Sequence, residues 1–204
     1  QGMEKDLEEC AEARWLAKPV LDSRALPLDS DNVRLQGPGV MSFEKKHTIS
    51  GKGSIRLDVP TDGCRRHPSN RAFSVTTMMR LLPGENLERF NRISLWIYVD
   101  SPAIANNFME LSIHNQGKHI MPLPGRFEGT HTLGIPHGEW QHVVWEFPYV
   151  YRDFVTGISL AIHAHRTPVP APQGITVYVD NMCLEQVEAD HYKGSVSYTH
   201  LTLP

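Results

Sequence analysis

Apolar and polar residues alternate along most of the chain, in short runs that glycine and proline separate. In Ser54–Pro60, for example, Ile55, Leu57 and Val59 fall on one face and charged residues lie between them. A period of two residues is that of a β-strand with one buried face. The same alternation predicts further strands at 72–82, 92–99, 108–114, 141–147, 155–163 and 175–187.

Strands of this length, bounded by Gly, Pro, Asn and Asp, are typical of an antiparallel sandwich. The 15 glycines and 15 prolines supply the turns between them. We therefore predict an all-β fold, with one antiparallel β-sandwich over residues 21–194. A leader over 1–20 precedes it, and a weak apolar stripe in 4–16 predicts a short N-terminal helix there.

Composition narrows the possible partners. The 20 Lys and Arg residues are outnumbered by 23 Asp and Glu residues, so a net charge of -3 gives no basic surface for nucleic acid. No stretch approaches about 18 uninterrupted apolar residues, and we predict no membrane span. Three widely spaced cysteines, Cys10, Cys64 and Cys183, exclude a fully paired disulfide framework, although one pair among them remains open.

The last ten residues, 195–204, differ from the rest of the chain. Their sequence SVSYTHLTLP contains no charged side chain. It resembles the translated adaptor sequence found at the broken ends of assembled sequencing reads. We therefore expect a non-native tail here, and a natural protein that continues past Gly194. A natural polar tail is the alternative.

Five segments resemble strands of jelly-roll carbohydrate-binding modules. They are GVMSFE at 39–44, GKGSIRL at 51–57, NRISLWIYV at 91–99, GEWQHVVWE at 138–146 and VYVDNMCLE at 177–185. With YRDFVTGI at 151–158 and DHYKG at 190–194, the chain is similar to N-terminal accessory domains of secreted bacterial glycoside hydrolases.

The resemblance covers about residues 20–193 and implies a jelly roll of the galactose-binding-like type. It also implies a non-catalytic carbohydrate-binding or structural module whose ligand is a poly- or oligosaccharide. Its other partner would be a downstream catalytic domain of the same chain. The expected location is secreted, periplasmic or at the cell surface.

Three aromatic residues are candidates for carbohydrate binding, because a flat ring matches the apolar face of a sugar. Trp140 enters its strand from a loop, while Tyr149 and Tyr151 bracket a turn. This entry from a loop suits a residue at the rim of a binding site, whereas the alternative for the tyrosines is that they merely belong to the turn. Trp145 alternates in phase with apolar neighbours, and we expect it in the core.

Glu44 and Asp180 are the candidate ligands of a structural Ca²⁺ ion. In the resembling modules, carboxylates near the first and the closing strands hold such an ion together with backbone carbonyls. Ca²⁺ takes six to eight oxygen ligands, which two carboxylates, carbonyls near residues 51–53 and water can supply. The alternative is that Glu44 pairs with nearby lysines and that Asp180 caps a turn with Asn181.

A stand-alone jelly-roll enzyme is the alternative function. His163 and His165 share a face of one strand and could hold a metal, as in the first half of the cupin motif. The glutamate that a cupin requires four or five residues later is replaced by Val169 and Pro170. A lyase or glycosidase would need two facing carboxylates, and the spacing of the acidic residues selects no pair. We therefore assign no catalytic residue.

Overall fold

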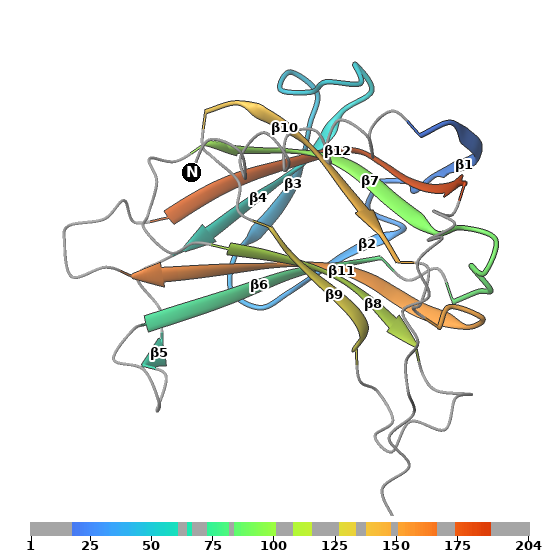
Figure 1. Ribbon diagram of the computed structural model, residues 1–204. Helices are drawn as coiled ribbons and strands as arrows, with labels where there is room; N and C mark the ends of the chain where they lie inside the picture. Colours follow the sequence, from blue (N-terminus) through green and yellow to red (C-terminus); the bar gives the residue numbers. More distant parts are fainter. Residues whose placement is uncertain are drawn as a thin grey trace, which may run out of the picture.

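The computed structural model describes residues 18–60, 65–66, 73–81, 84–100, 108–115, 127–133, 138–147, 151–166 and 174–188. All regular elements in this part of the chain are β-strands (Figure 1). The helix expected at 4–16 and the tail at 195–204 lie outside the described residues. Within those residues, no helix has the length and apolar character needed to cross a membrane.

Two antiparallel sheets form two layers (Figure 1). Sheet A has the order β10 (Trp140–Glu146), β7 (Arg92–Asp100), β12 (Gly174–Val187), β4 (Ser54–Pro60) and β3 (Val40–Glu44), with β1 (Val20–Ala25) also paired to β12. Sheet B has the order β2 (Val33–Gln36), β6 (Phe73–Leu81), β11 (Val155–Arg166), β8 (Phe108–Asn115) and β9 (Phe127–Leu133), with β5 (Arg65–Arg66) also paired to β6. The predicted antiparallel β-sandwich is confirmed.

The core lies between the sheets and is built from the apolar positions of the alternating pattern. In β7, Leu95 and Ile97 are fully buried, and in β8 Leu111 is fully buried as well. Burial of such aliphatic side chains, at about 25 cal/mol per Å² of apolar surface, is the main force holding two sheets together. Trp145 is 8% exposed and meets Phe147 edge to face at 5.1 Å, so its expected core position is confirmed.

The strand β12 lies in the middle of sheet A and contains a bulge. Its register with β7 shifts between Asp180 and Cys183, where Asn181 has a φ of 49°. Asparagine adopts this left-handed conformation more readily than most residues. The extra residue changes the phase of the strand, so that Val179 before the bulge and Met182 after it both point into the core.

Candidate functional site

The outer face of sheet A carries one aromatic ring from each of three neighbouring strands. Trp140 of β10 lies opposite Tyr98 of β7, which lies opposite Tyr178 of β12. We call these three residues the aromatic row. His47, from the loop after β3, has its ring centroid 4.3 Å from those of Tyr98 and Tyr178. It also stacks on Trp140, at 5.2 Å between centroids. The ring of His47 therefore occupies the space against the three rings of the aromatic row.

Asp180 holds the loop that carries His47. Its Oδ2 accepts hydrogen bonds from the Thr48 hydroxyl at 2.6 Å and from the backbone N–H groups of Ile49 and Ser50 at 2.7 and 2.9 Å. Its Oδ1 accepts from the Ser50 hydroxyl at 2.9 Å and from the Asn181 N–H at 2.7 Å. Burial alone raises the pKa of Asp180, but these bonds outweigh it, and the pKa lies below its ordinary value.

Glu44 and Asp180, the expected calcium ligands, line the same hollow of about 220 Å³. The Glu44 carboxylate accepts a bond from the Lys46 N–H at 2.8 Å, and this bond is the main cause of its lowered pKa. Because N–H and O–H donors already occupy both oxygens of Asp180, this arrangement does not fit a calcium ligand. In the described part of the chain, no group of three or more His, Cys, Asp or Glu residues could hold a metal. The hydrogen bonds of Asp180 thus argue against the calcium site that the resemblance implies, and its presence or absence is a question for a calcium titration.

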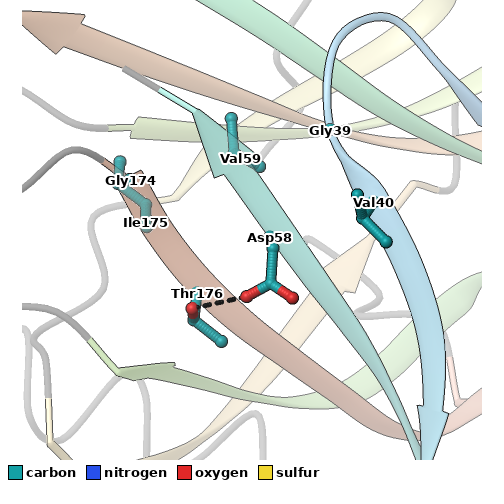
Figure 2. A pocket seen from close by; sticks show the side chains of 7 residues that line it. All are labelled: Gly39, Val40, Asp58, Val59, Gly174, Ile175 and Thr176. Atoms are coloured by element: carbon teal, nitrogen blue, oxygen red, sulfur yellow. Dashed lines mark hydrogen bonds between the residues drawn. The ribbon is translucent and has the colours of Figure 1, made fainter. Parts of the chain in front are cut away.

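A larger hollow of about 540 Å³ lies at the end of β3, β4 and β12. Figure 2 shows its lining residues, which are mostly aliphatic or glycine. Its one carboxylate, on Asp58, accepts a bond from the Thr176 hydroxyl at 2.7 Å (Figure 2). The same carboxylate is paired with Arg56 at 3.0 Å. The polar side chains at this hollow are thus already bonded to one another.

The outer face of sheet B carries polar residues in direct register across four strands. Arg34 of β2 lies opposite Arg80 of β6, Arg80 opposite Ser159 of β11, and Ser159 opposite Ser112 of β8. We call these four residues the polar row. The residues that alternate with them, such as Leu160 in β11, are part of the core. The row therefore stands on the side of sheet B that faces away from sheet A.

The centre of the polar row is enclosed by its neighbours. Ser159 and Ser112 are only 1% and 2% exposed. The Nε2 atom of His114 lies 2.7 Å from the Ser159 hydroxyl. His114 can reach over β11 because the residue opposite it is Gly157, which has no side chain. Burial, and then the charge of Arg80, lower the pKa of His114, so its imidazole is neutral at pH 7.

Two of the three expected carbohydrate-binding residues, Trp140 and Tyr151, are among the described residues. Trp140 belongs to the aromatic row. Tyr151 is 53% exposed and lies between β10 and β11, where its carbonyl accepts a bond from Asn115 at the end of β8. Tyr149 lies outside the described residues. These assignments stay predictions, and so does the metal pair in β11, because the side chains of His163 and His165 also lie outside the described residues.

Sequence reasoning did not identify His47 or the polar row. The sequence does place Tyr98 and Tyr178 opposite aliphatic faces, which is a signal for an outward ring. Nothing in the sequence places His47 beside them, because its position depends on the loop bonded to Asp180. The polar row depends on how β2, β6, β11 and β8 pair, and the periodicity of single strands does not specify pairing.

No family model matches the sequence, and no curated protein matches it. Solved structures do match. One comes from a study of the promiscuous specificity of carbohydrate-binding modules from the β-sandwich superfamily, with a TM-score of 0.56, 12% identity and 76% of this chain covered. This chain spans 57% of that structure. The family 30 carbohydrate-binding module gives a TM-score of 0.54 and 13% identity, covering 90% of this chain and 97% of the module.

An exo-β-agarase gives a TM-score of 0.51 and 16% identity, and the match covers 81% of this chain but 24% of the agarase. Identities this low establish the fold alone. The fold that the sequence resemblance implies is confirmed: the chain has the β-sandwich architecture of jelly-roll carbohydrate-binding modules.

Proposed function

We propose that this domain binds carbohydrate on the outer face of sheet B. The polar row is the observation that carries the proposal. Neighbouring strands lie about 4.8 Å apart, so a row across four strands is roughly 14 Å long, enough for a short oligosaccharide. The serine hydroxyls of the row are buried, so the guanidinium groups of Arg34 and Arg80 and the imidazole of His114 are the groups that offer hydrogen bonds to sugar hydroxyls.

Two features favour sheet B over sheet A. On sheet A, the ring of His47 already packs against all three rings of the aromatic row. In the hollow of about 540 Å³ at the end of β3, β4 and β12, the polar side chains of Asp58 and Thr176 are already bonded to each other. On sheet B, the buried Nε atom of Arg80 has no hydrogen-bond partner; the buried Nε2 atom of His47 on sheet A has none either, but it belongs to a ring that is already packed on three aromatic side chains. A buried donor of this kind is best satisfied by an acceptor that arrives with a ligand.

We further propose that the domain is a non-catalytic accessory module of a secreted glycoside hydrolase. The match to the exo-β-agarase supports this, because the similar fold makes up only part of that longer chain. Sequencing the natural gene past the codon for Gly194 tests the proposal. A glycoside hydrolase domain is expected there, and a stop codon or an unrelated domain would contradict it.

The binding face can be tested with two matched histidine variants. His114 lies beside the polar row, whereas His142 stacks on Trp96 on the outer face of sheet A, and burial lowers the pKa of both. A glycan array first identifies a ligand, and calorimetry then measures its affinity for each variant. We expect His114→Ala to weaken binding by about tenfold, the effect of roughly one lost hydrogen bond. We expect His142→Ala to change it less than twofold.

The same measurement on Trp140→Ala decides between the two faces. If Trp140→Ala abolishes binding while His114→Ala does not, the ligand lies on sheet A and the proposed face is wrong. Thermal melting of each variant shows whether the fold is intact. A glycan array without any ligand would contradict carbohydrate binding itself.

A further inference from the structure

The polar row brings two like charges together. Arg34 of β2 and Arg80 of β6 occupy directly paired positions on one face of sheet B. Like charges at paired positions destabilise a sheet. None of the ion pairs that join described residues includes either arginine. The two guanidinium groups are therefore not neutralised by a described carboxylate.

Two acidic residues in or beside sheet B, Asp29 and Glu110, form no ion pair with Arg34 or Arg80 in the described part of the chain. The Oδ1 atom of Asp29 accepts bonds from the N–H groups of Asp31 and Asn32 and from the Asn32 side chain, all within its own turn. Arg34 makes only a minor contribution to the lowered pKa of Asp29. Glu110 is in β8, two strands away from β6 in the sheet order.

The two guanidinium groups are held differently. Arg34 donates from Nη1 to the carbonyl oxygens of Ser30 and Val33, which fixes its position beside β2. Arg80 has a buried Nε without a hydrogen-bond partner, and its charge lowers the pKa of His114. A guanidinium presents its N–H groups as a rigid planar fork that matches the oxygens of a carboxylate or a sulfate.

We propose that the Arg34 and Arg80 pair binds an oxyanion of an acidic glycan, either the carboxylate of a uronic acid or a sulfate ester. This inference rests on the proposed carbohydrate binding and specifies its ligand class. An oxyanion satisfies the Nε donor and removes the repulsion between the two arginines.

The overall net charge of -3 does not prevent this binding. At physiological ionic strength, the interaction between exposed charges is largely screened beyond about 8 Å. The local charge at the row, which comes from two arginines, therefore decides the attraction of an anion. Affinity should consequently fall as the salt concentration rises.

Matched oligosaccharides separate charge from shape. One pair is tetragalacturonate and its fully methyl-esterified form, which share a backbone and differ in charge. The second pair is a sulfated carrageenan tetrasaccharide and its desulfated form. Calorimetry at low and physiological salt is expected to show at least tenfold tighter binding of one charged member than of its neutral partner. The pair that shows the preference identifies the oxyanion.

Two variants of Arg80 test the residue itself. Arg80→Gln removes the charge and should abolish the preference for the charged oligosaccharide. Arg80→Lys keeps the charge without the planar fork and should retain part of it. The matched control is Arg56→Gln on the outer face of sheet A, which should leave the preference unchanged. If Arg80→Gln fails to fold, Arg34→Gln at the exposed end of the row takes its place, with the same expected loss.

The outcomes separate this inference from the proposed function. Equal affinity for charged and neutral partners, or equal weakening of both by Arg80→Gln, would show that the row binds neutral glycan and would overturn the inference alone. Charged binding that Arg80→Gln and Arg34→Gln leave intact would overturn it too. No binding of any oligosaccharide would overturn carbohydrate binding as well.

Discussion

Asp180 of β12 binds Ser50 through both oxygens of its carboxylate, although the two residues are 130 positions apart in the sequence. The backbone N–H and the hydroxyl of Ser50 each donate a bond of 2.9 Å. This pairing fixes the loop between β3 and β4 against the bulge of β12. It also determines that His47, three positions before Ser50, lies on the aromatic row.

Replacing Asp180 should destabilise the domain strongly. Asp180→Ala leaves donors from Thr48, Ile49, Ser50 and Asn181 without their acceptor, and hydrogen bonds to a charged group contribute about 1.5 to 3 kcal/mol each. We expect the free energy of unfolding to fall by about 3 kcal/mol or more, measured by urea denaturation. The control is Asp58→Ala, because its half-exposed ion pair with Arg56 contributes about 1 kcal/mol or less. Equal losses for the two variants would contradict the role of Asp180.

Calcium dependence separates a hydrogen-bonded loop from a metal site. Since N–H and O–H donors occupy the Asp180 oxygens, we expect the melting temperature to be the same with added Ca²⁺ and with chelator. A bound ion would instead stabilise the folded state by mass action, and the melting temperature would rise with Ca²⁺ concentration. Such a rise, lost in Glu44→Ala, would establish the calcium site that the sequence resemblance implies.

Replacement by alanine should strongly destabilise the domain at Trp145 and hardly affect its stability at Tyr151. Trp145 is 8% exposed and packs in the core, so Trp145→Ala should cost on the order of 3 to 5 kcal/mol. Tyr151 is 53% exposed, and Tyr151→Ala should change stability by less than about 1 kcal/mol. Thermal denaturation followed by circular dichroism measures both. A larger loss of stability in Tyr151→Ala than in Trp145→Ala would mean that the core-facing side chains of β10 have been assigned to the wrong face.

Stability should decrease in mild acid because of two histidines. Burial lowers the pKa values of His114 and His142 in the folded state, whereas an unfolded histidine titrates near about 6.5. As the pH falls below this value, the unfolded chain binds protons first, and the equilibrium shifts toward it. The free energy of unfolding should therefore drop between about pH 7 and pH 5. The double variant His114→Gln, His142→Gln should have a shallower pH dependence, and an unchanged slope would contradict this assignment.

The sequence predicts the strands that have one aliphatic face. All seven strands expected from alternation are present. Apolar residues occupy alternate positions along them, for example Leu95 in β7 and Leu160 in β11. The alternation does not predict β1, β2, β3, β5 or β9, and only the resemblance at 39–44 indicates β3. The two residues of β5 are too few to show a period, and β9 has apolar side chains only at its ends, Phe127 and Leu133.

The candidate site is less accessible to sequence reasoning. An alternating pattern assigns Arg80 and Ser159 to faces of their own strands, but it does not place the two side by side. That neighbourhood follows from the sheet order, which results from pairing between distant strands. The bulge at Asn181 is a further limit, since it changes the phase of β12 within what reads as one uninterrupted strand.

The central position of β12 also has a consequence for biosynthesis. In sheet A, β12 pairs with β7 along one edge and with β4 and β1 along the other. These three strands lack β12 as a neighbour until residues 174–187 have been synthesised. A ribosome that has not yet released residues 174–187 therefore carries exposed strand edges, which are prone to pair with other chains. Folding of sheet A therefore completes only after translation of β12.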